Sequence, residues 1–326
     1  MGKGNMRREL LLATALLALS GLAGAQADYP SKPIRMVIPY AVGGAVDIMG
    51  RAIAKELSEL TGQNVIVENK GGAGGALAAV DVARSPADGY TLFFGATGPL
   101  AIVPVVQSKV AFDPIKDFTP VTLVATTPYV LVVNNNLPVK TVADLIALAR
   151  SKPGTLNFAS AGTGGPDHLA GELFKLSANL QMQHVPYKGA GPALADVVAG
   201  QVQMEFASPL PAMPLVEAGR LRLLAVTTPQ RSAALPQTPT VAESGLPGYD
   251  VTPWYGFLVR FGTPPAIVRR LHADLVKVMS KDDLRDSLKK RGLDPKTSTP
   301  EEFATFLAAE VGKWGKVVRD ANVRAE

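Results

Sequence analysis

The chain has 326 residues, of which 47% are hydrophobic, 19% are charged and 6% are aromatic. This composition is typical of a globular protein rather than a disordered one, and the length suits one large or two medium-sized domains. The formal net charge is +5, but residues 1–27 contribute part of it, and the remaining 30 basic and 27 acidic residues leave +3. No run of Lys and Arg carries interleaved aromatic residues, so the sequence does not predict a nucleic-acid partner.

The N-terminus has the pattern of an export signal. Arg7 and Arg8 precede an apolar stretch, residues 10–19, and Ala25-Gln26-Ala27 follows as a small-x-small sequence. This order predicts a signal peptide over residues 1–27, cleavage after Ala27 and a periplasmic mature protein. The apolar stretch is shorter than the ~20 residues that a transmembrane helix needs, and no later apolar run is long enough.

The sequence contains no cysteine. The exported protein is therefore expected to have no disulfide, no cysteine nucleophile, no cysteine-based zinc site and no lipid-modified cysteine, and about 300 residues can bury enough apolar surface to fold without them. The three histidines do not have the spacing of metal ligands, so we expect neither a metal nor a cofactor.

Short β-branched segments alternate with segments of helical periodicity. Apolar residues at helical spacing predict helices over 46–60 and 169–180, and two more are expected over 265–279 and 300–318. Thr141 and Thr299 each start a sequence typical of a capping box. The predicted strands are Ile34–Ile38, Val65–Glu68, Thr91–Phe94, Tyr129–Val133, Leu156–Ala159, His184–Tyr187, Val202–Phe206, Leu223–Val226 and Gly256–Val259.

Alternating strands and helices predict an α/β fold with mostly parallel, doubly wound sheets. The two halves repeat the same strand, glycine loop and helix, which predicts two doubly wound α/β domains around a central cleft. The C-terminal helices are expected to pack back on the first domain. We therefore predict domain 1 over residues 28–127 plus 252–326 and domain 2 over 128–251, with crossings near Thr126–Val130 and Asp250–Tyr255.

Two glycine loops, residues 40–47 and 160–165, are the strongest functional signal. Each follows a predicted strand and opens a predicted helix, whose N-terminus offers unpaired N–H groups and the positive end of the helix dipole. Glycine lets a ligand approach the backbone closely. One such loop alone is typical of an ordinary turn between strand and helix. The matched pair instead predicts a site for a small carboxylate, held by backbone amides and water rather than by arginine.

Four further residues are predicted in or beside this site. Ala96 and Thr97 follow the strand over 91–94 and are expected at the cleft edge. Asp47 would repel a bound carboxylate, so we expect it to complement the helix dipole or order its loop, unless the ligand carries an N–H group. His168 lies in the first turn after the second loop, either as a ligand contact or as a structural histidine bonded to a backbone carbonyl.

Catalytic interpretations find little support in the sequence. Ser160 lies in Phe-Ala-Ser-Ala-Gly, not in the Gly-x-Ser-x-Gly sequence of a nucleophile elbow. The glycines within residues 67–75 are paired and do not match the dinucleotide-binding spacing. His184 and His272 are expected to be structural or at the surface. Trp254 and Tyr255 are interpreted as a cavity wall, a hinge or core packing.

Several motifs in order resemble the receptors of tripartite tricarboxylate transporters, the Bug-type solute-binding proteins. They are Tyr29-Pro-Ser-Lys-Pro-Ile34, Pro39-Tyr-Ala-Val-Gly-Gly-Ala-Val-Asp47, Val67-Glu-Asn-Lys70, Gly72-Ala-Gly-Gly75, Ala87-Asp-Gly-Tyr-Thr-Leu92, Ser160-Ala-Gly-Thr-Gly164, His168-Leu-Ala170, His184-Val-Pro-Tyr-Lys-Gly189, Pro239-Thr-Val-Ala-Glu243 and Gly245-Leu-Pro-Gly248. The resemblance implies a fold like the type II periplasmic binding proteins, no enzymatic activity, and delivery of a carboxylate to membrane permease subunits.

The resemblance also implies ligand-binding residues in both loops, with ordered water completing the grip. By position these are Tyr40, Ala41, Gly43, Gly44 and Asp47 in the first loop, and Ser160, Gly162, Thr163 and Gly164 in the second. The chain departs from the family pattern at Lys70-Gly71, Tyr40, Gly165 and the segment that starts at Ser208. Because Tyr40 and Ser208 are expected to line the cavity, these departures bear on which carboxylate is bound: a di- or tricarboxylate, an aromatic acid or an acidic amino acid.

Two other functions remain compatible with the residues. A co-receptor that presents its ligand to a sensor kinase would have the same binding site. A periplasmic hydrolase is suggested only by Ser160 and His168. We expect the protein to act as a monomer.

Overall fold

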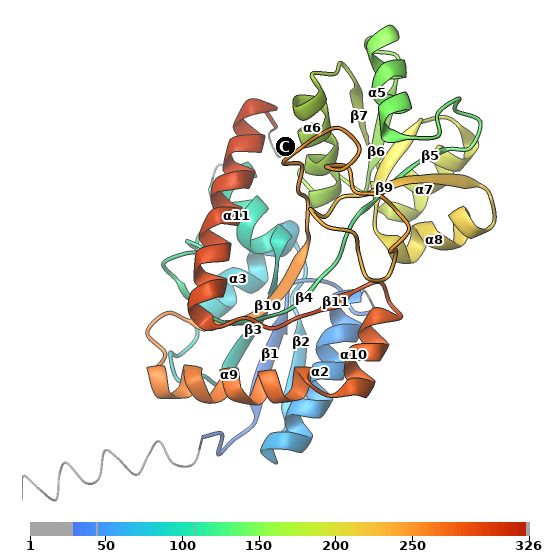
Figure 1. Cartoon of the computed structure of the whole chain (residues 1–326). Coiled ribbons are helices and arrows are strands. Elements are labelled where there is room, and N and C mark those ends of the chain that lie inside the picture. The colour runs from blue at the N-terminus through green and yellow to red at the C-terminus, as the bar shows by residue number, and fades with distance from the viewer. Residues whose placement is uncertain (1–28, 44, 108, 324–326) are drawn as a thin grey trace, which may run out of the picture.

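The computed structural model describes residues 29–43, 45–107 and 109–323 (Figure 1). The predicted signal peptide and Gly44 lie outside these residues. Across the described ranges, no helix combines the length and the apolar character needed to cross a membrane.

Two separate β-sheets form the framework of the protein, one in each half of Figure 1. The first has six strands in the order β11-β4-β10-β3-β1-β2, and the second has five in the order β7-β6-β8-β5-β9. The first sheet comprises β1 (Ile34–Ile38), β2 (Val65–Asn69), β3 (Thr91–Ala96), β4 (Phe118–Thr126), β10 (Trp254–Arg260) and β11 (Asp294–Pro295). The second comprises β5 (Val130–Asn134), β6 (Asn157–Ser160), β7 (Gln183–Pro186), β8 (Met204–Ala207) and β9 (Leu221–Val226).

β10 in the first sheet and β5 in the second run antiparallel to the strands on both sides of them, and each immediately follows a crossing between the halves. β4 ends at Thr126 and the chain enters the second sheet as β5, whose first residue, Val130, pairs with the last residue of β8. The return crossing leads into β10, which starts beside the ends of β3 and β4. The chain leaves one sheet at the carboxyl ends of its strands and enters the other sheet beside the carboxyl ends of the strands there. The strand that it then forms must run antiparallel to those neighbours. Both sets of carboxyl ends therefore face the space between the halves.

Helices cover both faces of each sheet, as a doubly wound fold requires. On the first sheet, α2 (Ala45–Thr61), α9 (Pro265–Met279) and α10 (Asp282–Lys289) share one core, while α3 (Ala76–Ala83) and α11 (Pro300–Asp320) cover the other face. On the second, α5 (Val142–Ser151) and α6 (Pro166–Ala178) lie opposite α7 (Ala190–Ala199) and α8 (Pro209–Glu217). Three short helices complete the set: η1 (Ala73–Gly75), η2 (Gly98–Ile102) and α4 (Val103–Val106).

The C-terminal helix α11 joins the two halves. It packs against β4, η2 and α4 of the first half and against α6 of the second, so a single apolar core runs from one half into the other. Its N-terminus carries the predicted capping box: the Thr299 side chain accepts a hydrogen bond from the Glu302 amide, and the Glu302 carboxylate accepts one from Thr299. The capping box at Thr141 is confirmed in the same way.

The predicted α/β class with two doubly wound halves is confirmed, with three corrections. β4 was not predicted, because Pro120 and the polar residues of Phe118–Thr126 obscure the strand, which pairs along β10. The helices η1, α3, η2, α4 and α10 and the short strand β11 were not predicted. The helix expected over 169–180 ends at Ala178, because Asn179 takes a left-handed conformation with φ 51°. The domain boundaries remain a prediction. The strands assigned to each predicted domain do belong to one sheet.

Candidate functional site

A cavity of about 950 Å3 lies between the carboxyl ends of the two sets of strands. Both glycine loops line it, the first from the β1–α2 connection and the second from the β6–α6 connection. Eight of the predicted site residues are among its lining: Tyr40, Ala41, Ala96, Thr97, Gly162, Thr163, Gly164 and Ser208. Four others are not among the described lining residues: Gly43, Asp47, Ser160 and His168. Gly44 is also a predicted site residue, but it lies outside the described residues.

Asp47 organises the first loop from behind. Its carboxylate accepts hydrogen bonds from the Gly43 amide and from Asn69 Nδ2, each at 2.9 Å, and pairs with Arg51. Asn69 Nδ2 also donates to the Tyr40 carbonyl at 3.0 Å, which ties the start of the loop to β2. Burial alone would raise the pKa of Asp47, but the bonds from Arg51, Gly43 and Asn69 outweigh it and lower the pKa. Asp47 is thus placed to order the loop, as one of the two expected roles requires.

Buried side chains hold the second loop in a similar way. The Asp167 carboxylate accepts a hydrogen bond from the Ala161 amide at 2.5 Å, and Ser160 Oγ accepts one from the Gly162 amide at 3.2 Å. His168 Nδ1 accepts one from the Gly164 amide at 2.9 Å. A structural His168 was expected to bond to a backbone carbonyl, but its partner here is the backbone N–H group of Gly164.

These bonds reduce the number of backbone amides that are available for the expected grip on the ligand. The N–H groups of Gly43, Gly162 and Gly164 are engaged within their own loops, so they are not open donors in this structure. Hydroxyl groups are better placed. Thr163 and Ser208 line the cavity, and Ser208 is the N-cap residue of α8 but makes no side-chain capping bond. Asp167 was missed in the sequence because its role depends on how the loop folds back.

The matching family model is that of the tripartite tricarboxylate transporter family receptor, and it covers residues 49–323. The chain belongs to this family. BugT of Bordetella pertussis is 33% identical over 323 residues, which cover 98% of this chain and 99% of BugT.

Two solved structures show the same relationship. R. palustris Rpa4515 with adipate is 37% identical with a TM-score of 0.79, over 91% of this chain and 99% of that chain. MatC from Rhodopseudomonas palustris with bound malate is 32% identical with a TM-score of 0.75, over 89% and 100% of the respective chains. The family and its fold are those of periplasmic solute-binding receptors.

Ser160 and His184 form a close pair in this receptor, but the pair is not placed for hydrolysis. Ser160 Oγ lies 2.6 Å from His184 Nε2, and the His184 ring stacks on His168 with centroids 3.6 Å apart. Burial and His168 lower the pKa of His184 to about 4, so its ring is neutral at pH 7. Ser160 is 0% exposed and is not among the described cavity lining, whereas a nucleophile must reach its substrate. This pair was not predictable from sequence patterns, because β6 and β7 bring together residues 24 positions apart.

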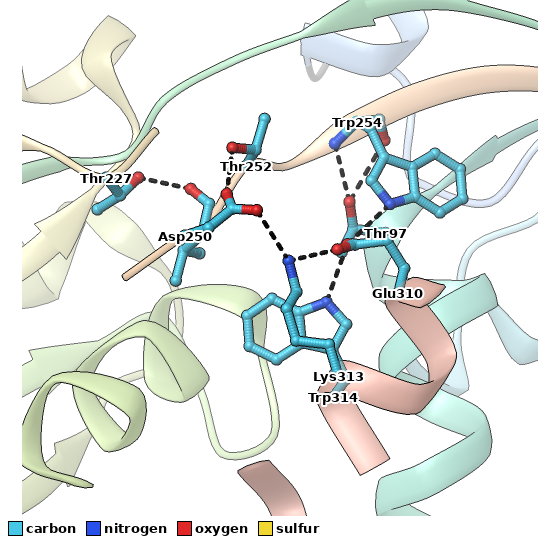
Figure 2. Close-up of polar contacts among 9 residues, drawn as sticks. Thr97, Thr227, Asp250, Thr252, Trp254, Glu310, Lys313 and Trp314 are labelled. Atoms are coloured by element: carbon cyan, nitrogen blue, oxygen red, sulfur yellow. Dashed lines mark hydrogen bonds and ion pairs between the residues drawn. The ribbon is translucent and has the colours of Figure 1, made fainter. Parts of the chain in front are cut away.

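The return crossing of the receptor is fixed by a polar network beside the cavity (Figure 2). Trp254 and Trp314 both donate from Nε1 to Glu310 Oε2 at 3.1 Å, and Lys313 pairs with Glu310 and with Asp250. The Trp254 amide donates to Thr97 Oγ1 at 2.8 Å. Trp254 and Tyr255 both line the cavity, and Trp254 is also packed in the core. Trp254 therefore serves both as part of the cavity wall and as a core residue.

Two acidic residues and a tyrosine of the cavity wall were not predicted from the sequence. Asp167, Glu205 and Tyr129 all line the cavity, and its described lining includes no Lys, Arg or His. A charged residue inside an apolar strand is the signal that singles out Glu205.

Proposed function

We propose that this receptor captures a small carboxylate between its two glycine loops and delivers it to permease subunits of a tripartite tricarboxylate-type transporter. In this proposal the chain is exported by the signal peptide over residues 1–27. The two halves, residues 28–127 plus 252–326 and residues 128–251, close around the ligand.

The observation that carries the proposal is that both loops line one cavity. Each loop precedes a helix, α2 or α6, whose N-terminal dipole end favours an anion. Hydrogen bonds to a charged group contribute about 1.5–3 kcal/mol each, and micromolar binding needs about −8 kcal/mol net. The hydrogen-bond donors proposed for such an affinity are the hydroxyl groups of Thr163 and Ser208, those of the lining tyrosines, and bridging water. The lining tyrosines are Tyr40, Tyr129 and Tyr255. The adipate and malate in the two R. palustris structures support a carboxylate ligand.

A thermal-shift panel tests the proposal. It compares aliphatic mono- and dicarboxylates, aromatic acids, amino acids and neutral sugars, with recovered ligand checked for chemical change. A ligand present at 100 times its Kd adds about 2.7 kcal/mol of stability, which raises the melting temperature measurably. We expect carboxylates alone to raise it and to be recovered unchanged. A response to sugars only would contradict the carboxylate assignment, and a hydrolysed ligand would contradict the receptor assignment.

A further inference from the structure

Glu205 is a buried carboxyl group with an unsatisfied oxygen in the wall of the cavity. Glu205 lies on β8, where it pairs with Val132 of β5 on one side and Ala159 of β6 on the other, and it is 1% exposed. Among the residues that the structure describes, no hydrogen-bond partner reaches Glu205 Oε2. A buried polar atom without a partner is costly and uncommon, so this oxygen points to a partner that the ligand supplies.

The described cavity lining around Glu205 contains a second acidic residue and no Lys, Arg or His. Asp167 of α6 lies on the same cavity wall, but its carboxylate is already engaged by the Ala161 amide. Tyr129, immediately before β5, and Tyr40 and Tyr255 are the other titratable residues of the described lining. Tyr187 precedes α7 and donates its hydroxyl hydrogen to Asp196 of that helix, so this pair is internally satisfied. Lys188 is exposed and is not among the described lining residues.

We propose that Glu205 is the specificity-determining residue of this cavity and that it binds an ammonium group of a ligand whose carboxylate lies at the glycine loops. The ligand class is therefore an amino-carboxylate, and this inference rests on the proposed function. An ammonium group has three N–H donors and no acceptor, so it satisfies Oε2 and neutralises the carboxylate. A second ligand carboxylate would meet two acids and no basic side chain in the described lining.

The proposal predicts the sign of a proton exchange. Burial, reinforced by Asp167, raises the pKa of Glu205 to about 8, so without a bound ligand Glu205 is mostly protonated at pH 7. An ammonium ligand favours the carboxylate form, so binding at pH 7 releases a proton and affinity increases from pH 6 to pH 8. A dicarboxylate would require the protonated form instead, and its binding would retain or take up a proton and weaken as the pH rises.

Isothermal titration calorimetry with three ligands of equal length tests the proposal. The ligands are 6-aminohexanoate, adipate and hexanoate, with the four- and five-carbon members of each series included. Titrations in two buffers of different ionisation enthalpy measure the proton exchange. We expect an amino-carboxylate to bind most tightly, with proton release. We expect Glu205→Gln to weaken its binding 10- to 100-fold while binding of the matched monocarboxylate changes less than threefold.

Two matched variants make the result interpretable. Glu217→Gln changes an exposed acid on α8 and should leave all affinities unchanged. Glu205→Met removes both oxygens at similar size, and serves if Glu205→Gln does not fold. The inference alone is overturned if a dicarboxylate binds most tightly, or if an amino-carboxylate binds both Glu205 variants as tightly as the wild type. Failure of all three ligand series and of every other carboxylate in the thermal-shift panel to bind would overturn the proposed function as well.

Discussion

At Gly164 the second loop touches the opposite half of the molecule. The residue has φ +76°, and a Cβ atom placed there would lie 3.1 Å from Val106 Cγ1 of α4. Because α4 belongs to the first half, a larger side chain at this position would both occupy the cavity and push the halves apart.

Gly164→Val is therefore expected to weaken carboxylate binding at least 10-fold while the protein stays folded. Gly154→Val is the matched control, because Gly154 has a similar φ of +73° but no neighbour within 4 Å of its Cβ position and no place in the described lining. Both variants bear the strain of a β-branched residue in the left-handed region. Calorimetry should show wild-type affinity for Gly154→Val and weakened binding for Gly164→Val. Wild-type affinity in both variants would place the ligand elsewhere.

Glu205 also predicts a pH dependence of stability. Its pKa is raised from 4.5 to about 8 in the folded state, so the folded protein binds more protons than the unfolded chain between these values. This contribution is fully present below pH 4.5 and is lost as the pH rises to about 8. Glu205→Gln removes the dependence, and we expect its stability gain over the wild type to grow from pH 5 to pH 8 by several kcal/mol, on the order of 3. Urea unfolding of the ligand-free proteins measures it, and a gain that is constant with pH would contradict the raised pKa.

The helix and strand elements show how far the sequence leads. Both glycine loops were predictable, because a strand, paired glycines and an apolar helical period follow each other at Ile34–Leu60 and again at Leu156–Leu176. Their internal hydrogen bonds were not, since Asp47 and His168 act through the way each loop folds back on its own helix. Tyr129 was assigned to a strand but precedes β5 and lines the cavity. Such details depend on strand register and facing, which periodicity alone does not determine.

The capping box of α11 gives a prediction for an element. Thr299→Ala removes the side chain that accepts from the Glu302 amide at 3.1 Å, so we expect a loss of about 1 kcal/mol in the free energy of unfolding. Thr305→Ala is the control, because Thr305 lies within the same helix and donates only to the Glu301 carbonyl. Urea titration of both variants checks this. A loss in the control as large as that of Thr299→Ala would argue against the cap.

At the scale of the whole molecule, two crossings and α11 connect halves that otherwise have separate sheets. Glu310 stabilises this connection, because its buried carboxylate accepts from the indoles of the return crossing and of α11 (Figure 2). It is 4% exposed and has Lys313 as its cationic partner.

Glu310→Gln removes the negative charge opposite Lys313 and leaves a single oxygen acceptor. We expect a loss of about 2–3 kcal/mol of stability and, because Trp254 lines the cavity, weaker ligand binding. Glu301→Gln, at an exposed position in the first turn of α11, should change stability by less than about 1 kcal/mol. Unfolding and calorimetry on both variants measure this, and a Glu310→Gln protein as stable as the wild type would show that the network contributes little.

The crystal structure of the receptor with the tightest carboxylate from the binding panel tests the central claim most directly. We predict one ligand carboxylate between the two loops, with hydrogen bonds of about 2.7–3.2 Å, direct or through one water, to residues 40–42 and to Thr163. A ligand carboxylate that contacts only one half of the molecule, or that lies outside the cavity, would contradict it.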